Sequence, residues 1–258
     1  MNKNAFTLAE VSSTHCAGAR KTAFTLAEVL ITLGIIGVVA AMTMPTLMNS
    51  TQGAQYKTAF KKALSALSQA ITLNMALDDV NFASITQAGD AGVTTKKSDN
   101  DTVASVLNSR MNIVKAAKGS EAGYGVDADD ATLSTFPAKV PTEVCTGSGE
   151  EKTCTEEQVV PDTFLFFNDG IMFAYKAADA VNCTEGDKVD TDDDNYCYGV
   201  VDVNGTKGPN KIVACDQGAT ATDANCTVTN PTDIYPVVFY DQTVLPASPA
   251  AKAVLYGK

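Results

Sequence analysis

Residues 23–48 read AFTLAEVLITLGIIGVVAAMTMPTLM, and the rest of the chain is organised around this stretch. Its part from Val29 to Met48 holds twenty residues without a charged side chain. A helix rises about 1.5 Å per residue, so this length matches a hydrocarbon layer roughly 30 Å thick. The sequence therefore predicts one membrane-spanning helix near the N-terminus.

Two residues distinguish this segment from an ordinary membrane anchor. Glu28 lies at its entrance and Pro45 lies near its exit. A carboxylate at the edge of a membrane helix is costly unless it reaches the headgroups or a positive partner. A proline removes a backbone donor and loosens the helix. For Glu28 two interpretations stay open, a solvated residue just outside the apolar core and a functional acid.

The order and spacing of these residues resemble a known export signal. Lys21 precedes the word AFTLAEV of residues 23–29, and an apolar run follows. Counted from Phe24 as the first residue, Glu28 is fifth and Pro45 is twenty-second. This pattern resembles the N-terminal signal of type IV pilins and type II secretion pseudopilins.

The resemblance implies processing and assembly. A prepilin peptidase would cut between Ala23 and Phe24, although the family usually has glycine before the cut, and would methylate the new amino group of Phe24. Glu28 would pair with the N-terminal amine of a neighbouring subunit, and the region around Pro45 would unwind on assembly. The implied partners are the bacterial inner membrane, the prepilin peptidase and other pilin or pseudopilin subunits. The implied location is a single-pass protein whose head lies outside the cytoplasm, in a filament after processing.

The resemblance also divides the chain. It implies a leader (residues 1–23), a transmembrane or filament-core helix (24–48), an amphipathic continuation (49–77) and a pilin-like globular head (78–258). Arg20 and Lys21, before the apolar run, favour a cytoplasmic leader. One alternative is a secretory signal peptide cut after the small residues 39–41. The corresponding alternative function is an exported or membrane-anchored binding or adhesin domain.

The leader repeats the signal. Residues 5–11 also read AFTLAEV, but the polar residues 12–15 follow them, so the first copy cannot be a membrane anchor. A local duplication and a start codon upstream of the true one are both compatible with this repeat.

Charge and histidine content argue against two classes of function. The whole chain has a formal net charge of −11, and removal of residues 1–23 leaves 16 basic and 29 acidic residues. Such a surface repels phosphates, so we expect no nucleic-acid partner. The only histidine, His15, lies in the leader. The mature chain would lack histidine-dependent catalysis, and we predict that it is not an enzyme.

Six cysteines lie beyond the membrane segment, and none is in a C-x-x-C pair: Cys145, Cys154, Cys183, Cys197, Cys215 and Cys226. An even number without zinc-site spacing predicts three disulfides and an oxidising compartment. Fifteen connectivities are possible, of which the pairing of sequence neighbours is the most economical. The alternative is free, buried cysteines in a reduced domain.

Beyond residue 55 an apolar stripe appears at helical spacing, formed by Tyr56, Phe60, Leu64, Leu67, Ile71 and Met75. It predicts one helix from Phe24 to Leu77, with an anchor and a separate helix joined at residues 49–53 as the alternative. Another helix is expected over residues 102–118, capped by Asp99 or Asp101. Residues 78–99 and 119–161 read as loops, the second of them stapled by a disulfide.

Aromatic and β-branched runs predict a small antiparallel sheet. Residues 163–175 read TFLFFNDGIMFAY, a hairpin with a primed turn at residues 168–170. Further strands are expected at residues 196–203 and 234–240, the latter at an edge because it contains Pro236. The sequence predicts an α+β fold in which this sheet packs on the second half of the long helix and disulfides staple the loops.

An acidic run followed by a turn-rich segment gives a candidate calcium site, although the predicted function requires no cofactor. Asp190, Asp192 and Asp194 match the first ligands of an EF-hand loop, but asparagine stands at residue 195 where glycine is needed. Residues 202–210 read DVNGTKGPN, similar to a segment of pilin-like head domains. Its carboxylate and amide oxygens, including those of Asp202 and Asn204, could fix the turn or coordinate a cation.

Overall fold

The computed structural model describes residues 25–88, 102–119, 140–146, 153–185, 196–218 and 221–257. The leader, including the predicted cleavage site at Ala23 and Phe24, lies outside these ranges. The chain divides into two compact units, residues 1–46 and 47–258, and each is considered by itself.

Helix α1 (Leu26–Asp78) is one continuous helix of 53 residues. This confirms the prediction of one long helix, and the alternative of two helices joined at residues 49–53 is wrong. In the first unit its apolar side chains are exposed, with Leu26 at 79% and Met42 at 72%. The stretch Leu26–Met44 is the one helical segment of the described residues that is long and apolar enough to cross a bilayer.

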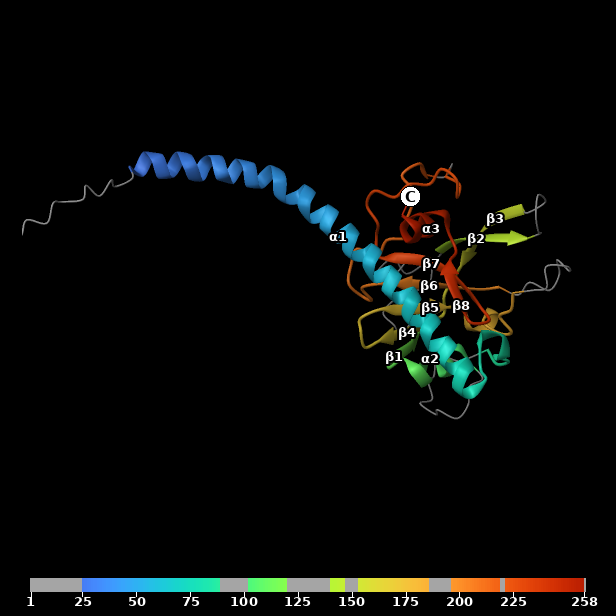
Figure 1. Cartoon of the computed structure of the whole chain (residues 1–258). Helices are drawn as coiled ribbons and strands as arrows, with labels where there is room; N and C mark the ends of the chain where they lie inside the picture. The colour runs from blue at the N-terminus through green and yellow to red at the C-terminus, as the bar shows by residue number, and fades with distance from the viewer. Residues whose placement is uncertain are drawn as a thin grey trace, which may run out of the picture. The chain divides into compact units, whose positions relative to one another are not determined.

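In the second unit α1 lies on a six-stranded antiparallel sheet, as Figure 1 shows. The strand order is β1-β4-β5-β6-β7-β8, formed by β1 (Ile113–Lys118), β4 (Thr163–Phe167), β5 (Met172–Tyr175), β6 (Cys197–Asp202), β7 (Ile234–Tyr240) and β8 (Thr243–Pro246). Phe60, Leu64, Leu67 and Ile71 of the predicted stripe are buried in the core, and Tyr56 and Met75 are half-buried. The predicted packing of helix on sheet is therefore confirmed.

Shorter elements complete the second unit. They are the helices α2 (Val103–Arg110) and α3 (Pro249–Tyr256), the 3-10 turns η1 (Phe82–Ser84) and η3 (Ala177–Asp179), and a hairpin of β2 (Val140–Thr146) with β3 (Thr153–Val159). The hairpin corrects the prediction of a loop over residues 119–161. In its register Cys145 and Cys154 are directly opposite, but their side chains lie outside the description.

The helix predicted over residues 102–118 is wrong in its second half. Thr102 caps α2, because its hydroxyl accepts a hydrogen bond from the Ser105 amide and Ser105 caps it in return. The backbone becomes extended at Met111, and residues from Ile113 onward form β1. Pairing of β1 with the aromatic strand β4 overrides the helical spacing.

The β4–β5 hairpin is confirmed, but its primed turn is wrong. Of the loop residues 168–170 only Gly170 has a positive φ, +86°. The Gly170 amide donates to the Phe167 carbonyl, and Phe167 donates to Ile171. This is a three-residue loop with glycine in the left-handed position, the next most common hairpin connection.

Strands β6 and β7 lie where they were predicted, but β7 is not an edge strand because it pairs with both β6 and β8. Pro236 is tolerated because the residue opposite it, Ala247, lies just past the end of β8. The Pro236 carbonyl accepts a hydrogen bond from the Ala247 amide, so the Pro236 nitrogen points to the same side. There its missing N–H costs no hydrogen bond within β8.

Candidate functional site

The N-terminal end of α1 is closed by a reciprocal pair of hydrogen bonds between Thr25 and Glu28. The Thr25 amide and hydroxyl each donate to Glu28 Oε2 at 2.8 Å, and the Glu28 amide donates to the Thr25 hydroxyl at 3.3 Å. This is a capping box, which satisfies backbone donors that a helix start leaves unpaired. Glu28 is therefore a helix cap in the isolated chain, a role that the spacing Thr25-x-x-Glu28 could have predicted.

Pro45 lies within α1, and its side chain is outside the description. Around the predicted assembly residues the helix surface is apolar, because Glu28 is the only charged residue between Leu26 and Met44. Gly34 and Gly37 open this surface further, since a Cβ built on either would meet no atom within 4 Å.

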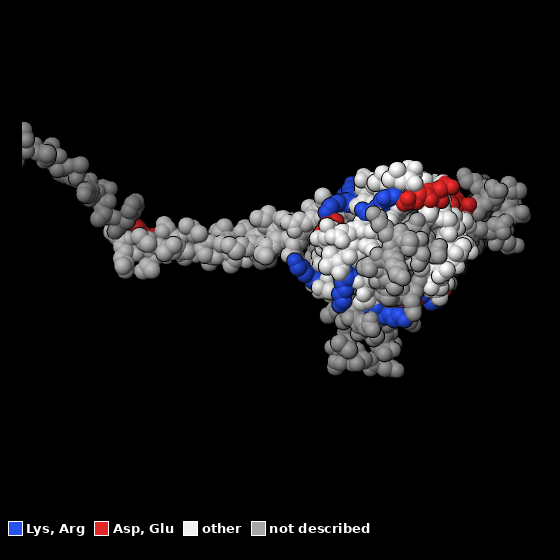
Figure 2. Space-filling model, turned by 90° about the horizontal axis from the view of Figure 1, so that it is seen from below, with Lys and Arg blue, Asp and Glu red and all other residues white. Residues whose placement is uncertain are grey.

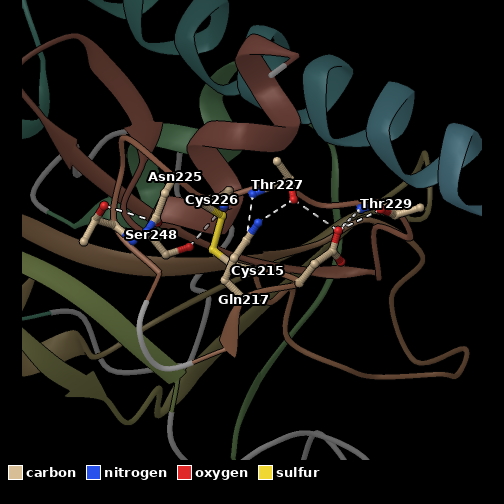
Figure 3. The surroundings of a disulfide bond; sticks show 10 residues. Cys215, Gln217, Asn225, Cys226, Thr227, Thr229 and Ser248 are labelled. Atoms are coloured by element: carbon tan, nitrogen blue, oxygen red, sulfur yellow. Dashed lines mark hydrogen bonds between the residues drawn. A yellow bond between two sulfur atoms is a disulfide. The ribbon is translucent and has the colours of Figure 1, made fainter.

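Two disulfides match the neighbour pairing of the cysteines. Cys183 is bonded to Cys197, and Cys215 to Cys226. Figure 3 shows the polar contacts around the second of these bonds. Asp216 Oδ2 accepts from the Thr229 amide at 3.0 Å and from its hydroxyl at 2.7 Å. Beside the Cys215–Cys226 bond, hydrogen bonds thus tie Asp216 to the residues that follow Cys226.

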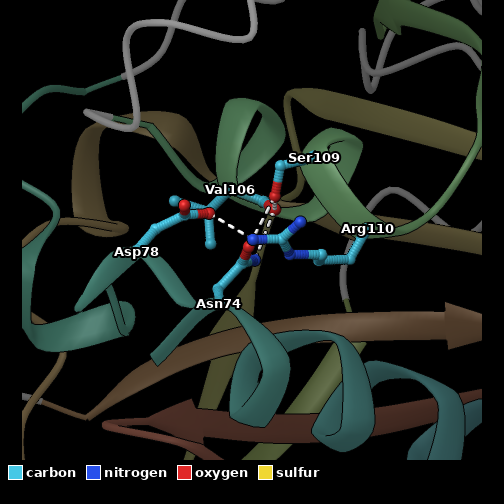
Figure 4. Close-up of polar contacts among 5 residues, drawn as sticks. All are labelled: Asn74, Asp78, Val106, Ser109 and Arg110. Atoms are coloured by element: carbon cyan, nitrogen blue, oxygen red, sulfur yellow. Dashed lines mark hydrogen bonds and ion pairs between the residues drawn. The ribbon is translucent and has the colours of Figure 1, made fainter. Parts of the chain in front are cut away.

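A second network joins the end of α1 to α2 (Figure 4). The buried Asn74 amide nitrogen donates to the Val106 carbonyl at 2.7 Å, and its oxygen accepts from the Ser109 hydroxyl at 2.6 Å. Arg110 forms an ion pair with Asp78 nearby. These contacts are structural, since they hold the head on its helix.

The turn-rich segment 202–211, which we call the Asp202 loop, leaves the end of β6 and returns to the start of β7. Asp202 Oδ1 accepts from the Asn204 amide at 3.0 Å, and Asn204 Nδ2 donates to the Gly208 carbonyl at 3.2 Å. At the other end Asp233 accepts from the amides of Asn210 at 2.7 Å and Lys211 at 2.8 Å. Both carboxylates are fully buried.

The Asp202 loop also leaves buried oxygens without a donor. Asp202 Oδ2, Asn204 Oδ1 and Asn210 Oδ1 receive no hydrogen bond. Burial raises the pKa of Asp202 to about 8; the nearby Asp233 carboxylate reinforces this shift, and the backbone amides of Asn204 and Gly205 oppose it. The Tyr56 hydroxyl of α1 approaches the Asn204 side chain but does not reach hydrogen-bond geometry at its Oδ1.

The predicted calcium residues therefore divide into two sets. Asp190, Asp192 and Asp194 lie outside the described residues, whereas Asp202 and Asn204 lie together in the loop. Sequence reasoning included Asn210 in the same segment but missed Asp233, whose carboxylate accepts a hydrogen bond from the Asn210 amide. Within the described ranges no group of three or more His, Cys, Asp or Glu side chains could hold a metal, so any cation here would need amide oxygens as well.

The surface of the head shows mixed charge. On the face in Figure 2, the described lysine and arginine side chains lie in separate groups, with an acidic group beside one of them. Two places carry polar groups that could bind a partner: the Glu28 carboxylate at the start of α1, and the buried oxygens without a donor in the Asp202 loop. Comparisons of the chain with protein-family models, with curated proteins and with solved structures gave no match.

Proposed function

We propose that this chain is a structural subunit, a minor pilin or pseudopilin, of a filament of the type IV pilus or type II secretion kind. It acts by assembly through its N-terminal helix after a prepilin peptidase has removed residues 1–23. The observation that carries the proposal is the spacing of Phe24, Glu28 and Pro45 along one apolar segment that follows Arg20 and Lys21.

The exposed apolar half of α1 supports this proposal because it needs a non-aqueous partner. Its side chains from Leu26 to Met44 have no protein cover among the described residues. A contiguous apolar surface of this length is stable in lipid or against other helices. Gly34 and Gly37 suit packing against other helices, because small residues let helices approach closely where no hydrophobic driving force exists. In our proposal α1 passes from the membrane into the filament core.

Glu28 has the bonding capacity for the assembly role. Both hydrogen bonds from Thr25 go to Oε2, and an ionised carboxylate has about four acceptor positions. After cleavage the new amine would lie on Phe24, next to Thr25 in sequence. We propose that Glu28 Oε1 accepts a hydrogen bond from the Phe24 amine of a neighbouring subunit. This ion pair neutralises both charges in an apolar environment and sets the register of one subunit against the next.

The disulfides support a head outside the cytoplasm. Cys183–Cys197 and Cys215–Cys226 persist only where thiols are oxidised. Basic residues before the apolar run and an acidic head after it favour the same orientation. The pilin-like character of the α+β head is part of the proposal.

The duplicated heptapeptide offers a matched control for the test. Glu28→Ala and Glu10→Ala change the same residue in the same local sequence, AFTLAEV. We expect Glu28→Ala to be cleaved normally but left out of filaments, and Glu10→Ala to behave like the wild type, because residue 10 is removed with the leader. Mass spectrometry of the mature N-terminus should give N-methyl-Phe24.

Two results would contradict the proposal. Normal filament incorporation of Glu28→Ala would remove the pairing role. A mature chain that begins at Met42, or one that keeps residues 1–23, would instead support the exported or anchored binding domain.

A further inference from the structure

A third place with the chemistry of a binding site lies where β6 begins and β7 ends, and assembly through α1 does not use it. The rings of Tyr196 and Tyr240 meet there with centroids 4.9 Å apart and planes inclined by 67°. In the β6–β7 ladder Cys197 is the Cα partner of Phe239, so the two tyrosines are the next cross-strand neighbours. Both are half-buried and therefore reach the surface of the head.

Two carboxylates lie beside this tyrosine pair. Asp241 follows Tyr240 in the turn after β7, and Asp241 Oδ2 accepts a hydrogen bond from the Glu185 amide at 3.1 Å. Burial raises the pKa of Tyr240, and the negative charges of Glu185 and Asp241 raise it further. Surroundings that disfavour a negative charge at the Tyr240 hydroxyl favour a positive charge at the same place. Among the ion pairs of the described residues, none involves Glu185 or Asp241.

The fold holds these groups together. The Asp241 amide donates to the Cys183 carbonyl at 2.9 Å, two positions before Glu185. The buried disulfide between Cys183 and Cys197 ties that segment to the start of β6, directly after Tyr196. The tyrosine pair and both carboxylates are thus positioned before any ligand arrives, which lowers the cost of binding one.

The chemistry of these groups selects an organic cation. The face of an aromatic ring and a carboxylate oxygen are both electronegative, so together they attract positive charge and repel anions. A metal ion fits poorly, because within the described ranges no three His, Cys, Asp or Glu side chains meet that could hold one. In a quaternary ammonium ion the charge is spread over methyl groups, which can pack directly on the rings.

We propose that Tyr196, Tyr240, Glu185 and Asp241 form a binding site for a quaternary ammonium group of the choline type. The tyrosine rings make the cation–π contacts, and the two carboxylates supply the opposite charge. The site lies wholly in the second unit, so the proposal does not depend on filament assembly.

The experiment uses the full chain in a maltoside detergent, which carries no ammonium group, and follows the tyrosine signals by NMR as choline is added. Choline should shift the Tyr196 and Tyr240 signals until they saturate. Its neutral isostere, in which carbon replaces the charged nitrogen, should leave them unchanged. Tyr240→Leu should weaken choline binding roughly fivefold, as loss of one cation–π contact predicts. Tyr240→Phe is the matched control, because it keeps the ring and should bind choline like the wild type.

A second variant guards against a folding defect, because the loss of a ring can disturb the sheet. Glu185 is exposed, so Glu185→Gln removes a charge without changing the packing. We expect it to weaken choline binding about twofold to fivefold and to make that binding less sensitive to salt. The proposal is wrong if choline gives no saturable shift or if its neutral isostere binds as well. It is also wrong if Tyr240→Leu and Glu185→Gln both bind choline like the wild type.

The same ammonium group occurs in free choline and in a lipid headgroup, and glycerophosphocholine separates these two sources. A site for the headgroup should bind glycerophosphocholine at least as tightly as choline. A site for the free ion should bind it more weakly, because the carboxylates of Glu185 and Asp241 repel its phosphate.

Discussion

The rings of Phe60 in α1 and Tyr235 in β7 stack with centroids 4.0 Å apart and planes inclined by 10°. Both side chains are fully buried, at the point where the helix meets β7, the strand next to the edge strand β8. This contact joins two elements that are far apart in sequence. The head is therefore joined to its helix by an aromatic pair within the shared core.

Replacing Phe60 with alanine should destabilise the second unit strongly. Loss of the buried ring and the cavity left behind should lower the free energy of unfolding by about 3–5 kcal/mol. Urea unfolding followed by circular dichroism measures this change. Leu73→Ala, on an exposed position of the same helix, is the control and should change the free energy by no more than about 0.5 kcal/mol. A double-mutant cycle of Phe60→Leu with Tyr235→Leu should give a coupling of about 0.5–1.5 kcal/mol, and zero coupling would contradict a specific stack.

The hydrogen bonds between Asn74 of α1 and residues Val106 and Ser109 of α2 give a second prediction about stability. Asn74→Ala removes two hydrogen bonds from a buried site, one to the Val106 carbonyl and one from the Ser109 hydroxyl, so the free energy of unfolding should fall by about 1–3 kcal/mol. Asp78→Asn breaks the neighbouring ion pair with Arg110, which is partly exposed, and should cost about 0–1 kcal/mol. Equal losses in the two variants would contradict this ranking.

Local sequence signals explain how much of this fold could be predicted. The β6 and β7 strands were found because aromatic and β-branched residues mark them. Helix α3 was missed although Ser248 and Pro249 form a recognisable start, with Ser248 as N-cap and proline at the first position. By contrast, β1 carries a helix-like spacing, and only its pairing with β4 makes it a strand.

The candidate sites also differ in how far they could be predicted from sequence. The capping box of Thr25 and Glu28 spans four residues and could have been recognised from sequence. The meeting of Asn210 with Asp233 joins residues 23 positions apart, and it depends on the return of the chain to the start of β7. No local pattern contains that information.

Tyr175 predicts how stability changes at alkaline pH. Burial raises its pKa well above that of an exposed tyrosine. Below the unfolded pKa of about 10 the hydroxyl is protonated in both states and has no effect on the pH dependence. Above it the unfolded chain releases this proton and the folded chain keeps it, so stability falls by up to about 1.4 kcal/mol per pH unit. In urea unfolding, Tyr175→Phe should therefore gain stability relative to wild type between pH 9 and pH 11, values chosen around that pKa. A difference that stays constant over this range would contradict the prediction.

The hydrogen bonds between Thr25 and Glu28 allow the capping role of Glu28 to be separated from its proposed role in assembly. Thr25→Val keeps the side-chain shape but removes the hydroxyl, which costs the cap about 0.5–2 kcal/mol while the Glu28 carboxylate stays in place. If the carboxylate acts on a neighbouring subunit, Thr25→Val should still enter filaments and Glu28→Ala should not. Glu28→Gln sharpens the comparison, because it keeps an acceptor for the Thr25 amide but has no charge to neutralise an amine. Filament yield, normalised to the amount of processed protein, measures all three. If Thr25→Val fails as completely as Glu28→Ala while Glu28→Gln assembles, Glu28 acts through the helix cap and not through its charge.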